Sequence, residues 1–321
     1  MDRFDNIPET ALAWHRAGKG AALATVVETW GSAPRRVGSQ LAISGEAEIA
    51  GSVSGGCVEG AVVAEALDAI EEGRPLMLEY GVSDDDAFAV GLACGGTIRV
   101  LVEPVGSVMP EKLLEELVIA RQGRVPVAYV TGLNVDRKLL RAGHERRFRM
   151  DRSGFEEDGE TFIAIHNPPL RLIIVGAVHI AQALVPMARI AGYDPVLVDP
   201  RESFASEGRF PGETVLQDWP DEGLRAIGMD GRTALVLLTH DPKLDDPALV
   251  EAVGSDVFYI GALGSTRTHA KRVERLRQRG LDDDQIARIH APVGLDIGAA
   301  GPAEIAVSIL AEMTQVLRRG A

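Results

Sequence analysis

Two cysteines lie beside paired glycines in the first half of the chain. Cys57 follows Gly55 and Gly56 at the start of a predicted helix, and Cys94 precedes another glycine pair. The helix dipole and free N–H groups at a helix N-terminus favour the thiolate form of a cysteine. The glycines would also let a large ligand approach the backbone. We therefore predict that both cysteines contact a ligand. Two small buried cysteines are the alternative interpretation.

The second half contains a dinucleotide-binding fingerprint that is altered in the middle. The pattern G-x-G-x-x-G/A requires a glycine for the tight turn, a glycine facing the pyrophosphate and a small residue for helix packing. Gly176 and Ala181 supply the first and third, but Val178 takes the second place. Asp199 lies about 20 residues further on, where an acid binds a ribose hydroxyl. The pattern predicts a Rossmann-type fold with a doubtful pyrophosphate site.

Three other places carry candidate binding residues. His179 is the first residue of the predicted helix after the fingerprint turn. It could contact a ligand, act as a base or have only a local structural role. Gly264 and Ser265 form a turn before a helix that contains Arg267, which is typical of an anion site. Arg35 lies with a second arginine near the first glycine-rich segment and suits a phosphate or the polar edge of a pterin. Solvated surface cations are the alternative.

The elements that would position these residues differ between the two halves. The first half predicts a mixture of strands and helices, with strand-like pieces that include residues 146–150. The second half alternates regularly, which favours a parallel sheet covered by helices. Its predicted strands are 170–175, 195–198, 234–238 and 257–260, and its helices are 179–191, 247–253, 266–279 and 302–317. Ligands of such sheets bind at the carboxyl ends of the strands.

The length of 321 residues predicts two domains, 1–167 and 168–321, because two consecutive prolines at 168–169 set an extended connector. The overall fold class is α/β: an N-terminal α+β domain and a C-terminal Rossmann-like domain with a parallel sheet. The net charge of −14 argues against nucleic acid and anionic membranes as partners. Without a recognisable signal peptide or an apolar run of about 18 residues, we expect a cytoplasmic protein.

Taken together, several stretches resemble the XdhC/CoxI family. In the first half these are GSAPRRVGSQLAI, GSVSGGCVEG and LACGGTIRVLVEP. In the second half they are RLIIVGAVHIA, LVDPR, LLTHDP, YIGALGSTRTHAKR and PVGLDIGAAGPAEIAVSILAEM. Each stretch is weak alone, but their order and spacing make the resemblance specific from about residue 14 to about residue 317.

The resemblance implies a chaperone and not a metabolic enzyme, with no catalytic residue assigned. Proteins of this family are similar to chaperones that bind molybdenum cofactor, as molybdopterin or its dinucleotide form, protect it during sulfuration and insert it into a xanthine dehydrogenase-type hydroxylase. The implied partners are the molybdenum hydroxylase apoenzyme, a cysteine desulfurase and a cofactor-maturation enzyme. A homodimer is the commonest assembly for such a chain.

By position, the resemblance carries over to Cys57, Cys94, Gly176, His179 and Asp199. Because molybdenum accepts soft sulfur ligands, Cys57 becomes the candidate metal ligand. Val178 departs from the family pattern GxGH, which puts dinucleotide binding at that turn in doubt. Two other functions remain open: an NAD(P)-dependent oxidoreductase that uses the Rossmann domain, and an interaction module without a small-molecule ligand.

Overall fold

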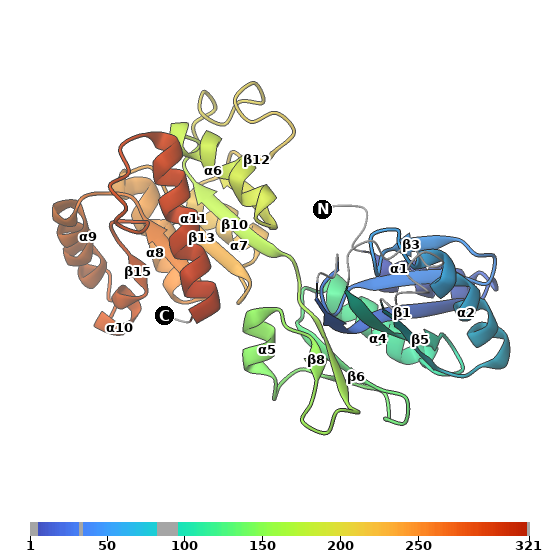
Figure 1. Ribbon diagram of the computed structural model, residues 1–321. Coiled ribbons are helices and arrows are strands. Elements are labelled where there is room, and N and C mark those ends of the chain that lie inside the picture. The colour runs from blue at the N-terminus through green and yellow to red at the C-terminus, as the bar shows by residue number, and fades with distance from the viewer. Residues whose placement is uncertain (1–5, 32–34, 82–95, 320–321) are drawn as a thin grey trace. The chain divides into compact units, whose positions relative to one another are not determined.

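A computed structural model describes residues 6–31, 35–81 and 96–319 (Figure 1). The chain divides into two compact units, Met1–Pro168 and Pro169–Ala321. The division lies one residue beyond the expected domain boundary, at the two consecutive prolines. Cys94 and the turn residues 32–34 lie outside the described ranges. Within those ranges, no helix is long and apolar enough to cross a membrane.

The first unit contains two antiparallel sheets. The larger has the strand order β3-β2-β1-β5-β4 and the smaller has the order β7-β6-β9-β8. The strands are β1 (Ala21–Trp30), β2 (Gln40–Ser44), β3 (Ile49–Gly51), β4 (Leu76–Tyr80), β5 (Thr97–Pro104), β6 (Val127–Thr131), β7 (Lys138–Leu140), β8 (Gly154–Phe155) and β9 (Phe162–His166). The helices are α1 (Ile7–Arg16), α2 (Glu59–Glu72), α4 (Glu111–Gln122) and α5 (Glu145–Met150).

The helices of this unit cover the apolar faces of the sheets. Buried residues of β1 and β5 share one core with α1, α4 and the smaller sheet. The opposite face of the larger sheet packs against α2 through Val62, Ala66 and Ala69, which recur at helical spacing. Gly73 ends α2 in the left-handed conformation at φ 66°, as its position after the apolar pattern predicts.

The second unit is a parallel sheet with helices on both faces, which confirms the predicted fold class. Its strand order is β12-β11-β10-β13-β14-β15, and every neighbouring pair is parallel. The strands are β10 (Leu170–Val175), β11 (Tyr193–Val198), β12 (Thr214–Leu216), β13 (Thr233–Leu237), β14 (Tyr259–Ala262) and β15 (Ile289–His290). The helices are α6 (His179–Ile190), α7 (Pro220–Ile227), α8 (Pro242–Val253), α9 (Thr266–Gln278), α10 (Asp283–Ala287) and α11 (Pro302–Arg319).

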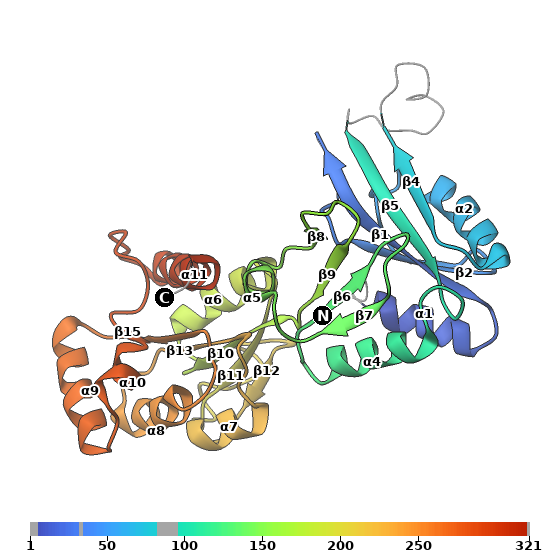
Figure 2. The same ribbon diagram turned by 90° about the horizontal axis from the view of Figure 1, so that it is seen from below.

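The strand order reverses direction between β10 and β13, as in a dinucleotide-binding fold. Figure 2 shows α6 and α11 on one face of this sheet and α7 and α8 on the other. Alternate residues of β10 account for the two layers: Leu172 and Ile174 pack towards α6 and α11, whereas Ile173 and Val175 pack towards α7 and α8. The crevice expected for a ligand is therefore at the carboxyl ends of β10 and β13.

Two sequence-based predictions are wrong in detail. Residues 146–150 form most of helix α5 and not a strand. Periodicity separates strand from helix poorly in so short a segment, and only Phe148 of these residues packs against the neighbouring sheet. Helix α8 begins at Pro242 and not at Pro247, because Asp241 caps it by accepting a hydrogen bond from the Lys243 amide at 2.9 Å.

Candidate functional site

The glycine-rich loop before α2 presents Cys57 one residue before Val58, the N-cap of that helix. Gly55 and Gly56 are exposed and have φ values of 76° and 111°, which side chains other than glycine rarely adopt. A Cβ added to Gly56 would meet no atom within 4 Å, so the space beside this part of the loop is open. Cys57 itself is half-buried and packs against the core under α2.

The loop is held by the carboxylate of Glu59, which the sequence-based prediction missed. Glu59 Oε1 accepts hydrogen bonds from the Ser54 amide at 2.9 Å and the Ser52 hydroxyl at 2.6 Å. Its Oε2 accepts from the Gly56 amide at 2.8 Å and from the Ser54 hydroxyl. Burial opposes ionisation, but these hydrogen bonds outweigh it and lower the pKa of Glu59 to about 2. The loop is therefore preformed around a carboxylate anion.

The hydrogen bonds from the loop to Glu59, called here the Glu59 clamp, change the expected surroundings of Cys57. The sequence predicted free N–H groups near the thiol, but the amides of Ser54 and Gly56 donate to Glu59, and the Val58 amide donates to the Ser54 hydroxyl at 2.9 Å. An acidic residue in the first turn of a helix is the signal that would have identified the clamp.

Cys57 is the residue that the sequence suggested as a metal ligand. Within the described ranges, no group of three or more His, Cys, Asp or Glu side chains lies close enough to hold a metal ion. Arg35 is exposed, and among the described residues no hydrogen bond or ion pair joins it to the Cys57 loop. In the part of the chain that the structure describes, Cys57 therefore does not belong to a preformed set of three protein ligands.

In the second unit, the fingerprint turn lies at the switch point of the sheet. Gly176 has φ 106°, and a Cβ there would lie 2.5 Å from Thr239 Cγ2 in the loop after β13. Glycine is required at this position because the two loops touch. Val178 has φ −96° and ψ 179°, which any residue adopts, and it packs partly against the core beneath α6. His179 is exposed at the first position of α6.

Asp199 follows β11 as predicted, but its carboxylate is already engaged. The residue is fully buried, and its Oδ2 accepts hydrogen bonds from the Ala177 amide at 2.9 Å and Arg201 Nη2 at 2.7 Å. Its Oδ1 accepts from Arg201 Nε at 2.8 Å. Burial opposes the charge, yet the bonds from Arg201 and the amides lower the pKa of Asp199. The side chain thus joins the fingerprint turn to Arg201, and no free oxygen faces a ribose.

The turn before α9 is a capped helix N-terminus. Ser265 Oγ accepts from the Thr268 amide at 3.2 Å, and Gly264 has φ 140°. Arg267 is exposed next to it. The structure therefore places Gly176, His179 and Asp199 together around the switch point, with Gly264, Ser265 and Arg267 two strands away at the same edge. Cys57, Gly55, Gly56 and Arg35 belong to the first unit.

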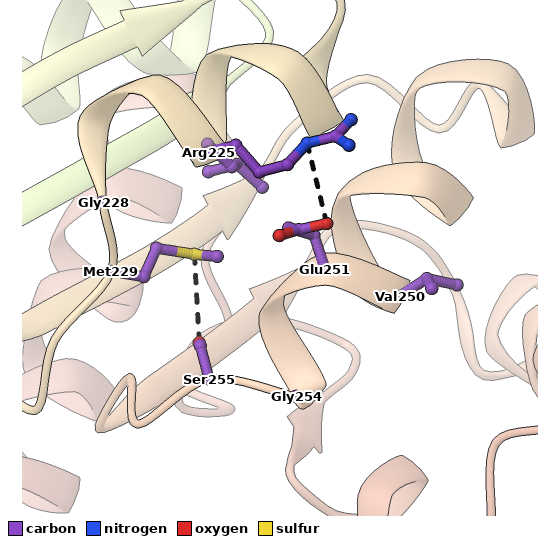
Figure 3. A pocket seen from close by; sticks show the side chains of 8 residues that line it. Arg225, Gly228, Met229, Val250, Glu251, Gly254 and Ser255 are labelled. Carbon is purple, nitrogen blue, oxygen red and sulfur yellow. Dashed lines mark hydrogen bonds and ion pairs between the residues drawn. The ribbon is translucent and has the colours of Figure 1, made fainter.

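A shallow pocket of about 460 Å³ lies elsewhere in the second unit, between the ends of α7 and α8 (Figure 3). Its wall includes an ion pair between Arg225 and Glu251 at 3.9 Å and a contact of Ser255 Oγ with the Met229 sulfur at 3.9 Å. The end of α7 leads into the amino end of β13, and the end of α8 leads into the amino end of β14. The pocket is thus at the edge opposite the switch point, and none of the predicted site residues lines it.

Comparisons with known proteins match both halves of the chain. The profile described as the XdhC Rossmann domain matches residues 172–313, and that of the XdhC and CoxI family matches residues 14–81. A relative from Escherichia coli, named molybdenum cofactor insertion chaperone PaoD, is 32% identical over 94% of this chain and 84% of its own length. A Bacillus subtilis relative, whose name describes a probable component of xanthine dehydrogenase, is 27% identical over 93% of this chain and 94% of its own length.

A solved structure has the same architecture. It is described as a xanthine dehydrogenase from Bacillus halodurans and aligns with a TM-score of 0.67 at 26% identity. The alignment covers 98% of this chain and 96% of the other.

Proposed function

Because the chain belongs to the XdhC and CoxI family, we propose that it is a chaperone that binds molybdenum cofactor, protects it during sulfuration and inserts it into a molybdenum hydroxylase. The observation that carries this proposal is the relative named as a molybdenum cofactor insertion chaperone, which is 32% identical over 94% of the chain. Its similarity extends through both units and is not confined to the Rossmann domain, which serves many unrelated functions.

The Cys57 loop supports binding of the metal end of the cofactor. A thiolate is a soft ligand of the kind that molybdenum accepts. The open space beside Gly56 leaves room for a bulky group next to the half-exposed cysteine. The Glu59 clamp keeps the loop in one conformation, so little conformational entropy would be lost on binding.

The proposed partners are a xanthine dehydrogenase-type apoenzyme, a cysteine desulfurase that supplies sulfur and an enzyme that matures the cofactor. We also propose that the chain acts as a homodimer in the cytoplasm, where its two cysteines would stay reduced. The name of the Bacillus subtilis relative, which refers to xanthine dehydrogenase, supports a molybdenum enzyme as the recipient.

Retention of the cofactor tests the proposal. Purified protein is mixed with molybdenum cofactor under anaerobic conditions and passed through a gel-filtration column, and molybdenum and pterin are measured in the protein peak. We expect both to coelute with the wild-type chain. Cys57→Ser, which preserves side-chain size, is expected to reduce the retained molybdenum at least about tenfold because a metal ligand is lost.

Cys94→Ser is the matched comparison, since it removes the chain's other thiol. Unchanged retention in Cys57→Ser would remove Cys57 from the site, whereas a loss confined to Cys94→Ser would move the metal contact to that loop. If the wild-type chain retains neither molybdenum nor pterin, the proposed function is wrong. Activation of a molybdenum hydroxylase apoenzyme by the loaded chain tests the insertion step separately.

A further inference from the structure

Two arginines and a phenylalanine form a cluster after β11 that the proposed function does not use. The guanidinium carbon of Arg201 lies 4.0 Å from the centre of the Phe204 ring, and that of Arg209 lies 5.4 Å from the same centre. An aromatic face holds guanidinium groups in this way through its negative quadrupole. The Phe204 ring therefore contacts both guanidinium groups.

The charges of the two arginines are balanced differently, because Asp241 as well as Asp199 attracts Arg201. Arg201 is paired with the buried Asp199, but among the described residues no carboxylate forms an ion pair with Arg209. Of the acidic side chains in the same segment, Glu207 accepts a hydrogen bond from the Gly212 amide at 3.0 Å, and Glu202 is exposed without an ion pair to either arginine. An uncompensated arginine is notable in a chain of net charge −14.

The position of the cluster in the fold indicates which part of a ligand it would meet. In Rossmann domains, the residues after the second strand bind the ribose, where an acid accepts a hydroxyl and a nearby arginine accommodates a phosphate. Asp199 cannot accept a hydroxyl here, because both of its oxygens are engaged and the residue is fully buried. The group that faces solvent at this position is the guanidinium of Arg201, whose side chain is 37% exposed.

We propose that Arg201 and Arg209 bind a phosphate monoester at the carboxyl end of β11. The Nη1 side of Arg201, which Asp199 does not engage, and the guanidinium of Arg209 can donate N–H groups to the oxygens of a doubly charged phosphate. Such a group exists on two kinds of ligand: a nucleotide with a phosphate on its ribose, and molybdopterin with its terminal phosphate. The phosphate site goes beyond the chaperone role, because a nucleotide can also occupy it. Only the molybdopterin form of the proposal rests on the proposed function.

Calorimetric titration with paired probes provides the test. The first pair is 2′-AMP and adenosine, and the second is the oxidised pterin derivative of molybdopterin with and without its phosphate. We expect one phosphorylated probe to bind at least about tenfold more tightly than its partner, the usual effect of a charged hydrogen bond. The pair that shows this preference identifies the source of the phosphate.

Arg209→Gln should abolish the preference, because it removes the charge without touching the Asp199–Arg201 ion pair. Arg209→Lys, which keeps the charge but loses the planar fork, should retain part of it. Arg277 is an exposed arginine of α9 that pairs with Asp283. Arg277→Gln is therefore the matched control and should bind the probes as the wild type does. The proposal is overturned if neither phosphorylated probe is preferred, or if the preference survives in Arg209→Gln.

Discussion

Replacing Glu59 by glutamine should weaken the first unit and loosen the loop that carries Cys57. The substitution preserves the shape of the side chain but removes its charge. It also turns one acceptor oxygen into a donor that faces other donors, among them the amides of Ser54 and Gly56. We expect the free energy of unfolding of this unit to fall by about 3 kcal/mol at pH 7, an upper value that follows from the pKa of Glu59.

The magnitude is worked from the change in pKa on folding. The pKa of Glu59 falls from 4.5 to about 2, and each unit corresponds to about 1.4 kcal/mol. Because the folded state has the lower pKa, the stabilisation is fully present above pH 4.5 and is lost as the pH falls towards 2. About 2 kcal/mol should therefore remain at pH 3.5, so wild type and variant should differ less there than at pH 7.

Urea unfolding followed by tryptophan fluorescence measures this difference. The chain has three tryptophans, of which Trp14 and Trp30 lie in the first unit and Trp219 in the second. Trp219 is 50% exposed, so Trp219→Phe is a mild background in which the signal reports the first unit alone. Separate signals matter because a chain of two units need not unfold in one transition.

Glu71 is an exposed glutamate at the other end of α2. Glu71→Gln is the matched control and should change the free energy of unfolding by no more than about 0.5 kcal/mol. The reasoning is refuted if Glu59→Gln costs less than about 0.5 kcal/mol at pH 7, or if its cost is the same at pH 7 and pH 3.5.

Two further substitutions test other buried contacts. Arg137→Ala should destabilise the first unit by about 3 kcal/mol or more in urea unfolding, because it leaves the carboxylate of Glu103, 1% exposed and 3.1 Å from Arg137, without its cation. A cost no larger than that of Arg141→Ala, an exposed arginine nearby, would contradict this. Gly176→Ala should lower the second unit's stability by about 2 kcal/mol in calorimetry, since its Cβ would meet Thr239 Cγ2 at 2.5 Å and its φ of 106° strains alanine. A loss below about 0.5 kcal/mol would show that the two loops separate easily.

Local patterns in the sequence were sufficient for much of the fold. The alternation of apolar strands and amphipathic helices after Pro169 determined the parallel sheet, because each element repeats its own apolar period. Gly73 and Gly176 were predicted as turn or cap positions, and both have positive φ. The order of short motifs also indicated the family, which the matches over residues 14–81 and 172–313 confirm.

The tertiary structure decided what the polar side chains of these motifs contact. Asp199 had the right position for a ribose contact, but folding places Arg201 and the Ala177 amide on its oxygens. Helix α5 forms where residues 146–150 suggested a strand, since a segment of one or two turns has too few apolar positions to fix its period.

The loop before α2 shows most clearly which features the sequence specifies and which depend on the tertiary structure. Its glycines and Cys57 could be read from the sequence, as could the start of the helix. The hydrogen bonds from the Ser54 and Gly56 amides to Glu59 could not, because they depend on the path of the backbone between those residues. A sequence pattern specifies which groups are available, whereas the fold determines which of them remain free for a ligand.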